Sequence, residues 1–340
     1  MGNIFETLIT RPFAWVLLQL YNLTGSYGVA IILFGILVKL ILFPFSIKGK
    51  RGNVDIQKLQ PKIKELEKKY GKDKEKYSAA VQKLYEEENV KPMSGCLWTL
   101  IPFPILICLY QVIRQPLTYL YNLTSEQIQK VVEFFGKTYE ATNTYLELEV
   151  APLIHEKWAE VSTLLGKSDL LDIDFHFLGL NLGETPSITS ISLIIIIPII
   201  SAITGFISTK VTMYLQNKLS GVEPDKSQNN IVMTLMMPAI SLWFGFIMPA
   251  GMSVYWIIQN ILGIGQEFIL HKYFLKVLAK EAEEARIKEE KRRKKEELRK
   301  AEIQKRKQEE AKSHTKKFKV KKNLDELKPT NNAEDSEENI

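Results

Sequence analysis

Ionisable side chains in unusual surroundings are the first candidates for chemistry in this chain. Lys39 lies inside an apolar run over residues 26–47. Asp172, Asp174 and His176 alternate with apolar residues, so an extended chain would place them on one face. Carboxylate and imidazole groups could bind a metal ion, but no second cluster accompanies them, and simple polar–apolar alternation explains the pattern better. Lys39 is therefore the leading functional candidate.

The apolar run around Lys39 is long enough to cross a membrane as a helix. Its 22 residues would rise about 33 Å, against a bilayer core of roughly 30 Å. Lys39 would then lie within about 4 Å of the midplane, where a lysine costs roughly 2.5–3.5 kcal/mol on insertion scales. Its side chain is too short to reach the interface, about 10 Å away. Lys39 therefore needs water, an anion or a polar cavity at membrane depth.

Other catalytic arrangements are not found in the sequence. The histidines, at positions 155, 176, 271 and 314, are scattered, and no apolar segment carries an Asp–Asp pair or a Ser–Lys arrangement. No Gly-rich phosphate loop precedes a Lys-Ser or Lys-Thr pair. Cys96 and Cys108 share one apolar segment and lack the spacing of a zinc site or a disulfide framework. We therefore expect neither an enzyme nor a bound cofactor or metal.

Charge and hydropathy divide the chain into apolar segments and highly charged ones. Mean hydropathy is near zero, yet the apolar segments are almost free of charged residues. This segregation is typical of a membrane domain with polar cytoplasmic parts. It predicts an all-α polytopic membrane protein whose five spans cover residues 26–47, 95–115, 188–210, 231–248 and 252–270.

Residues 1–25 precede the first predicted span and contain a shorter apolar stretch. The stretch after Pro12 is about 11 residues long, too short to span a bilayer. Arg11, Trp15 and Tyr21 suit the membrane–water interface, so we expect an amphipathic helix lying in that interface, with a sixth span as the alternative. The region lacks the basic start and small-residue cleavage site of a signal peptide.

The distribution of Lys and Arg predicts the orientation of the spans. Residues 48–91 contain 13 Lys and Arg, and residues 271–340 contain 22. Residues 116–187 contain four Lys, no Arg and 11 acids. Because basic segments stay in the cytoplasm, we expect the N-terminus and residues 116–187 outside and the C-terminus inside. The polar loop 211–230 then lies on the cytoplasmic side.

The two basic segments have different helical patterns. Residues 48–91 carry apolar residues at helical spacing on both sides of Gly71. This pattern predicts a cytoplasmic helical hairpin, with a solvated linker of two weak helices as the alternative. The tail 271–340 combines Glu–Lys pairs four residues apart with a basic cluster over 291–295. It suits a polyanion such as RNA or anionic lipid, and a merely solvated helix fits equally well.

Neutral polar side chains accompany Lys39 at membrane depth. They are Thr99, Gln111, Ser201, Thr204, Ser241, Gln259 and Asn260. A transporter usually has paired ionisable residues or broken helices in two matching halves, and neither pattern is evident. The other spans are interpreted as free of ionisable partners, which leaves Lys39 without an expected counter-charge in the chain.

Several short motifs are specific in their order and spacing. They are YGVAII at 27–32, VKLILFP at 38–44, LQPKI at 59–63, NVKPMSGC at 89–96, and MPAGMSVYW at 248–256 followed by Gln259-Asn260. Together they resemble the YidC family of membrane protein insertases, over about residues 26–115 and 188–275. That resemblance implies a five-helix core around a hydrophilic groove that opens to the cytoplasm and to lipid.

The resemblance also implies which residues would meet a client protein in this groove. They are Lys39, Gly35, Thr99, Gln111, Trp256, Gln259 and Asn260. Lys39 stands where the family pattern usually has arginine, which keeps the charge but loses the planar guanidinium. Trp256 matches a tyrosine that the family places near the client helix. The anion that Lys39 needs would then arrive with the client.

The function implied by the resemblance is the nucleotide-independent insertion and folding of new membrane proteins. Expected partners are nascent membrane proteins, the lipid bilayer, a ribosome on the basic tail and the Sec translocon, but not DNA. The expected location is the bacterial plasma membrane. Two other functions remain open: a channel or transporter that would conduct a solute past Lys39, and a ribosome-docking scaffold that would depend on the tail instead.

Overall fold

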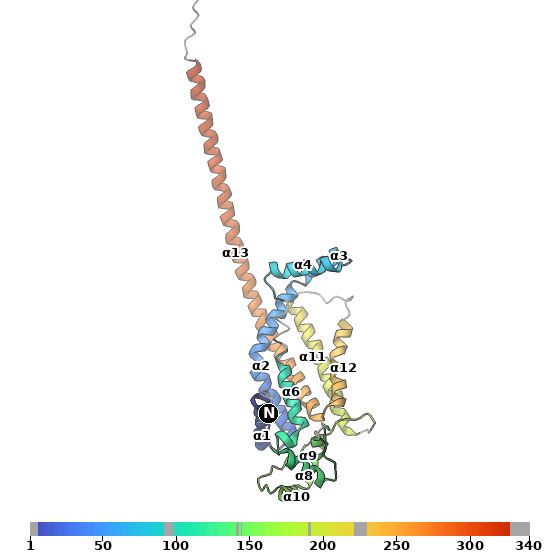
Figure 1. Ribbon diagram of the computed structural model, residues 1–340. Helices are drawn as coiled ribbons and strands as arrows, with labels where there is room; N and C mark the ends of the chain where they lie inside the picture. The colour runs from blue at the N-terminus through green and yellow to red at the C-terminus, as the bar shows by residue number, and fades with distance from the viewer. Residues whose placement is uncertain are drawn as a thin grey trace, which may run out of the picture. The chain divides into compact units, whose positions relative to one another are not determined.

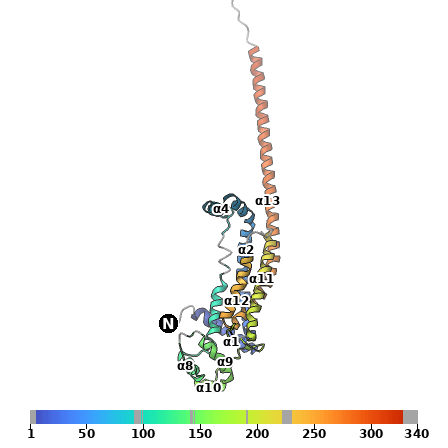
Figure 2. The same cartoon turned by 90° about the vertical axis from the view of Figure 1, so that its right-hand side faces the viewer.

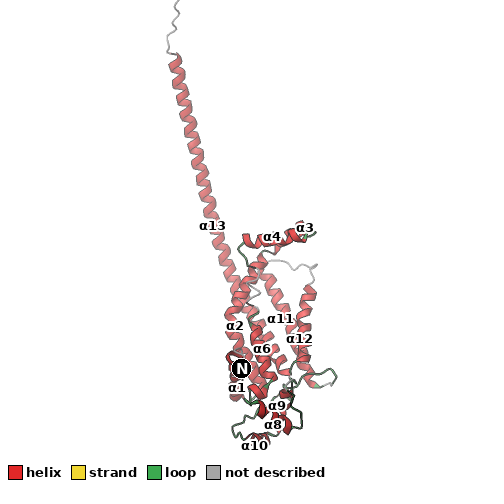
Figure 3. Cartoon of the chain, in the orientation of Figure 1, coloured by secondary structure: helices red, strands yellow, loops and turns green. Residues whose placement is uncertain are grey.

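The computed structural model describes residues 6–91, 98, 100–140, 143, 145–189, 192–220 and 230–326, and these are mostly helical (Figure 3). A π-helical turn, Glu6–Thr10, leads into α1 (Arg11–Thr24) and α2 (Tyr27–Lys58). The later elements are α3 (Gln60–Tyr70), α4 (Lys74–Glu87), α6 (Pro102–Arg114), α7 (Pro116–Tyr119), α8 (Ser125–Phe134), α9 (Leu146–Glu156), α10 (Trp158–Leu165), β1 (His176–Phe177), β2 (Leu180–Asn181), a 3₁₀ turn (Leu193–Ile195), α11 (Ile196–Ser220), α12 (Asn230–Ile247) and α13 (Ala250–Glu326). The predicted all-α class is confirmed.

α1 lies alongside α2, and both of its ends have local causes (Figure 1). Pro12 occupies the first turn, where no backbone N–H is needed. Gly25 ends the helix in the left-handed region, at φ 65°, and its N–H donates back to the last turn. α1 buries Ala14 and Leu17 but leaves Trp15 exposed. The helix therefore has one packed face and one open face that carries an aromatic side chain.

α2 continues well past the predicted end of the first span. The helix runs through Pro44 and ends at Lys58, so residues 48–58 belong to it and not to the hairpin predicted over 48–91. A proline inside a helix removes one backbone hydrogen bond and kinks the helix, but packing can hold the turns beyond it. Val54 is buried beyond the proline, which accounts for the extension.

α3 and α4 pack against each other within the predicted hairpin. A turn at Gly71 separates them, and Asp73 caps α4 by accepting a hydrogen bond from the Lys76 N–H at 3.2 Å. Lys62 near the start of α3 and Glu88 just after α4 form an ion pair. This pair brings the outer ends of the two helices together, as an antiparallel arrangement requires.

Two helical segments of the described chain are long and apolar enough to cross a membrane, namely α2 and Leu193–Leu219. Shorter apolar helices cover Pro102–Arg114 and Pro238–Ile247. The predicted span 95–115 begins among residues that lie outside the described ranges, so α6 is counted only from Pro102. The predicted span 252–270 lies within α13, whose helix continues into the charged tail. The division into five spans stays a prediction.

Residues 116–187 are here called the cap segment, and their described part contains four short helices and one strand pair. β1 and β2 are antiparallel, and their turn places Leu178 and Gly179 at φ 53° and 77°. Phe177 packs so closely on Gly28, at the start of α2, that no side chain would fit there. The cap segment therefore rests directly on the first turn of α2.

The cap segment also holds the start of α13. The backbone N–H groups of Ala250 and Gly251 donate to the carbonyl oxygens of Glu184 and Leu182, each at 2.9 Å. Both N–H groups belong to the first turn of a helix, where no carbonyl of the same helix can accept from them. The cap segment thus satisfies two of these donors and fixes where α13 begins.

α11 and α12 pack side by side (Figures 1 and 2). An added Cβ at Gly245 would lie 2.6 Å from the Cβ of Pro198, so glycine permits the close approach. Ser201 and Ser241 join the two helices through their hydroxyls, 3.3 Å apart. α11 leaves a set of large isoleucine side chains exposed, namely Ile196, Ile199, Ile200, Ile203 and Ile207. Lipid would cover such a surface.

Residues 276–340 form a unit separate from residues 1–275. In its described part, α13 carries ion pairs between residues three or four apart, among them Arg293–Glu289 and Lys294–Glu290, both at 2.8 Å. Each such pair stabilises a helix by only about 0.3–0.5 kcal/mol. Many together can hold a solvated helix.

Candidate functional site

A cavity of about 410 Å³ lies among α2, α6, α11 and α13. Its lining combines one lysine, one carboxylate and several amides and hydroxyls with aromatic and aliphatic side chains. The lining residues are Lys39, Pro102, Phe103, Leu106, Ser208, Thr212, Tyr255, Trp256, Gln259, Asn260, Gly263, Gln266 and Glu267. Phe103 is 54% exposed, so the cavity reaches the protein surface at α6.

The Lys39 ammonium points toward α13 at a glycine. A Cβ added at Gly263 would lie 3.6 Å from Lys39 Nζ and 3.5 Å from Ser208 Oγ, so the missing side chain leaves room for the lysine head. Lys39 is half-buried, and the described residues give its Nζ no hydrogen bond or ion pair. The polar surroundings that the sequence predicts for Lys39 are therefore present. Its ammonium remains available to form an ion pair with an added anionic group.

Two adjacent amides of α13 tie the helices around the cavity together. Gln259 Nε2 donates to the backbone carbonyl of Gly35 in α2 at 2.9 Å. Asn260 Nδ2 donates to the Ser201 carbonyl and to Thr204 Oγ1 in α11, both at 3.3 Å. Because successive residues of a helix point about 100° apart, this pair can hold neighbours on two sides. Both amides also face the cavity.

The structure brings together some of the residues predicted for the groove and separates others. Lys39, Trp256, Gln259 and Asn260 all line the cavity. Gly35 is buried behind it, where an added Cβ would lie 2.7 Å from Ile258 Cγ2. Gly35 therefore allows α2 and α13 to approach closely, which is a packing role.

Two further predicted groove residues are not in the described lining. Gln111 is near the other end of α6, where its Oε1 accepts a hydrogen bond from the Thr10 hydroxyl at 3.1 Å. It fixes the turn before α1 to α6 and does not face the cavity. Thr99 lies outside the described residues.

Glu267 overturns the expectation that Lys39 has no counter-charge in the chain. It lies within the predicted span 252–270, lines the same cavity and is close enough to Lys39 for electrostatic interaction. Its ion-pair partner, however, is Lys50 of α2, and the two residues are only 8% and 6% exposed. Because the first span was predicted to end at residue 47, Lys50 was assigned to the solvated hairpin, and its ion pair with Glu267 was not predicted. Lys39 and Lys50 are 11 residues, or three helical turns, apart. This spacing could have indicated that both lysines lie on one face of a single helix.

Gln266 adds an unused polar group to the site. Its Oε1 is buried and has no hydrogen-bond partner among the described residues. A buried acceptor without a partner is costly, so this oxygen suits a donor from water or from a bound chain. Ser208 and Thr212 of α11 contribute hydroxyls to the same lining. The cavity can therefore solvate a polar chain segment.

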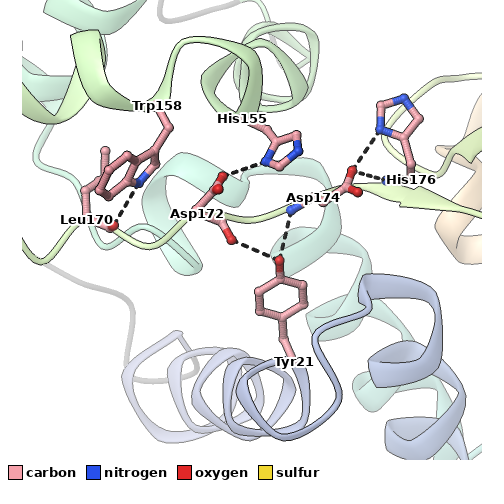
Figure 4. A network of polar contacts seen from close by, with 7 residues as sticks. All are labelled: Tyr21, His155, Trp158, Leu170, Asp172, Asp174 and His176. Atoms are coloured by element: carbon pink, nitrogen blue, oxygen red, sulfur yellow. Dashed lines mark hydrogen bonds and ion pairs between the residues drawn. The ribbon is translucent and has the colours of Figure 1, made fainter.

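Asp172, Asp174 and His176 lie in the cap segment and do not converge on one point (Figure 4). Asp172 Oδ1 pairs with His155 Nδ1 at 2.6 Å, while Asp174 Oδ1 pairs with His176 Nδ1 at 2.8 Å. The described residues contain no group of three or more His, Cys, Asp or Glu that could hold a metal ion. The three residues belong to two separate acid–imidazole pairs, Asp172 with His155 and Asp174 with His176.

Tyr21 connects this network to α1. Its hydroxyl donates to the Asp172 carbonyl and accepts from the Asp174 N–H, both at 2.9 Å (Figure 4). Trp158 Nε1 donates to the Leu170 carbonyl at 2.9 Å. The network thus fastens the extended end of the cap segment to α1, α9 and α10, which gives its polar residues a structural role.

The His155–Asp172 pair should make the stability of the cap segment depend on pH. The Asp172 carboxylate raises the pKa of His155 above its usual value. A raised folded-state pKa contributes stability that is fully present below about pH 6.5 and lost as pH rises through the folded value. Both side chains are well exposed, so we expect an effect of only about 0.2–1 kcal/mol.

Thermal unfolding of the native chain and of His155→Gln, between pH 5 and pH 8.5, measures this effect. The difference between the two proteins should be largest at the acid end and shrink toward the alkaline end. Asp172→Asn should abolish the pH dependence of that difference. A difference that grows with pH would contradict the assignment.

Taken together, the helical fold, the exposed isoleucine face and the polar cavity define a helical membrane protein with an internal polar site. The chain belongs to the 60Kd inner membrane protein family, whose model matches residues 19–277 and so includes every residue of the cavity lining. By that description it is an inner membrane protein.

Several of its relatives carry the same name. Proteins called membrane protein insertase YidC are 33% identical over 264 residues in Granulibacter bethesdensis and 30% identical over 270 residues in a Janthinobacterium species. These matches each cover 78% of this chain, and 38% and 37% of the relatives. The protein of that name from Methylobacillus flagellatus is 28% identical over 82% of the chain and 39% of its own length. The chain thus spans about two fifths of the length of these curated relatives.

Proposed function

We propose that this chain is a membrane protein insertase that receives new membrane proteins in the Lys39 cavity and releases them into lipid. The relatives named insertase support this class of function. The observation that carries it is the cavity itself, because its lining is polar around Lys39 and reaches the surface at an apolar helix, α6. A client with a polar tail and an apolar helix needs both surroundings.

The physical difficulty in insertion is the polar tail. Its backbone groups lose their hydrogen bonds to water in hydrocarbon, at a cost of several kcal/mol for each unsatisfied group. A hydrated cavity within the membrane shortens the dry path. Lys39 attracts an acidic residue of the tail and holds it transiently, while amides and hydroxyls such as Gln259 and Ser208 supply hydrogen bonds. Because each of these contacts is weak, the tail can dissociate from the cavity and cross to the outer side.

The apolar helix of the client supplies the driving force. Burial of apolar surface contributes roughly 25 cal/mol per Å², so a helix that reaches lipid is trapped there. The client leaves sideways, along the face where Phe103 of α6 meets the cavity rim. Because this free energy comes from the client, the proposal needs neither a nucleotide nor covalent chemistry.

The proposed orientation follows from charge. The basic segments 48–91 and 271–340 lie in the cytoplasm, and the cap segment lies on the outer side. In this orientation α3 and α4 receive the client, the cap segment closes the cavity outward, and the basic tail offers a docking site for a ribosome. The Sec translocon is a further proposed partner. Accessibility of single cysteines to a membrane-impermeant reagent tests this arrangement.

Site-specific photo-crosslinking tests the proposed function. A photoreactive residue at Trp256, in the cavity lining, should capture a nascent membrane protein held on a stalled ribosome. The matched control is Leu178, which is 86% exposed at the turn of the cap segment and should not capture it. Capture should depend on the length of the nascent chain. Equal capture from both positions, or none from Trp256 at any length, would contradict the proposal.

A further inference from the structure

The net charge of the cavity depends on a residue that does not line it. The charged residues of the described lining are Lys39 and Glu267, and their formal charges, +1 and −1, sum to zero. Lys50 is not part of the lining but forms the ion pair with Glu267. With Lys50 included, the three residues carry +1. The formal charge of this group of residues therefore depends on Lys50, which lies outside the cavity lining.

The helix geometry places Glu267 between two lysines. Lys39 and Lys50 are 11 residues apart on α2, so they share one face and are separated by about 16 Å along the axis. On α13, Glu267 lies one turn beyond Gly263, the point that Lys39 Nζ approaches. Glu267 is thus within reach of either lysine, and its contact in the structure is with Lys50.

Burial favours the pair with Lys50. Lys50 and Glu267 are almost completely buried, whereas Lys39 is only half-buried and faces the cavity. A buried charge is stable only when it is paired. Separating the Glu267 carboxylate from the Lys50 ammonium would therefore be costly. His271, buried one turn further along α13, and Lys218 of α11 face the same cluster and interact electrostatically with each other. Neither is an ion-pair partner of Glu267 within the described residues.

We infer that Lys50 is a positioning residue that holds Glu267 away from Lys39 and thereby makes the cavity selective for clients with an acidic tail. The inference rests on the proposed function and names its specificity determinant. Without Lys50, the Glu267 carboxylate would turn to Lys39, the lysine that lines the cavity beside it. The cavity would then be neutral, and an acidic residue of a client would find its site occupied by an internal anion.

A charge series in the full-length chain tests this inference. Lys50→Gln makes the three-residue sum zero, Glu267→Gln makes it +2, and the double variant restores +1. Lys50→Arg keeps the charge and is the conservative control. Each protein is reconstituted in liposomes with two clients that differ only by Asp or Asn in the translocated tail, and the ratio of their insertion rates is measured.

The expected ratio of Asp client to Asn client follows the charge. It should fall about tenfold in Lys50→Gln, the effect of a coupling near the low end of those measured between close charges. It should return to the native value in the double variant and in Lys50→Arg, and rise in Glu267→Gln. If Lys50→Gln does not fold, the double variant still decides, because it leaves neither a buried lysine nor a carboxylate unpaired. Since Lys50 acts through Glu267, it should be dispensable once Glu267 is removed, and a ratio in the double variant well below the native value would overturn the inference.

A second measurement needs no client and separates this inference from the proposed function. The rate at which acetic anhydride acylates Lys39, followed by mass spectrometry, reports whether its amine is held protonated in an ion pair. Acylation should slow severalfold in Lys50→Gln and recover in the double variant. An unchanged rate would overturn the sequestration of Glu267 even if insertion proceeds as proposed. Slowed acylation without any insertion activity would instead reject the proposed function alone.

Discussion

Replacing Lys39 by glutamine should slow the insertion of clients with an acidic tail by about tenfold or more, as loss of a close charge pair implies. Clients with an uncharged tail should insert at nearly the native rate, because the hydroxyls and amides of the cavity remain. Lys39→Arg should retain most of the activity, since it keeps the charge. Insertion rates in proteoliposomes, with clients matched except for one Asp or Asn, measure the effect.

The same substitution should not destabilise the protein. A lysine at membrane depth costs roughly 2.5–3.5 kcal/mol on insertion scales, and the described residues give Lys39 no ion pair that its removal would break. Lys39→Gln should therefore unfold at the same or a higher temperature while it loses activity. A less stable variant, or one that inserts the acidic client at the native rate, would show that Lys39 has a structural role instead.

Replacing Gly35 by alanine should have a large effect on stability. Its Cβ would lie 2.7 Å from Ile258 Cγ2 and 3.3 Å from Gln259 Nε2, so α13 would have to move away from α2. That movement also weakens the Gln259 hydrogen bond to the Gly35 carbonyl. We expect a loss of about 1–3 kcal/mol, typical of an overpacked site. Unfolding in detergent by heat or denaturant measures it.

Gly265 provides the matched control on α13. An added Cβ there meets no atom within 4 Å, and alanine is favoured over glycine within a helix by about 0.5–1 kcal/mol. Gly265→Ala should therefore stabilise the protein, while Gly35→Ala destabilises it. If Gly35→Ala also stabilised the protein, helix propensity, and not the contact between α2 and α13, would determine the result.

Some residues of the cavity lining have a recognisable signal in the sequence, and others do not. Lys39 could be identified because a charge inside an apolar run has few physical solutions, and Gln259 and Asn260 because amides are rare at that depth. Gly35 was associated with the groove through a family resemblance, whereas its contact with Ile258 can be seen only when α2 and α13 are placed together. A packing role of this kind leaves no local pattern in the sequence.

The missed ion pair has a related explanation. Hydropathy ends a predicted span where charges begin, so Lys50 was assigned to a solvated hairpin, although α2 continues to Lys58. Two opposite charges that bury each other do not behave as solvated charges, and hydropathy cannot distinguish the two cases. The contact of Gln111 could not be predicted for a similar reason, because its partner Thr10 is 101 residues away. The surroundings of Gly35, Lys50 and Gln111 all depend on contacts between segments that are distant in the sequence.

The backbone hydrogen bonds that hold Ala250 and Gly251 give α13 a fixed origin. Because a helix rises 1.5 Å per residue, Trp256, Gly263 and Glu267 lie about 9, 20 and 26 Å along the axis from Ala250. The cap segment therefore fixes the residue at which α13 begins, and with it the axial position of every later residue of the helix. One extra residue between Ala250 and Trp256 would turn every later polar group by about 100° and shift it by about 1.5 Å. The cap segment thus determines the depth and direction at which the cavity presents its polar groups.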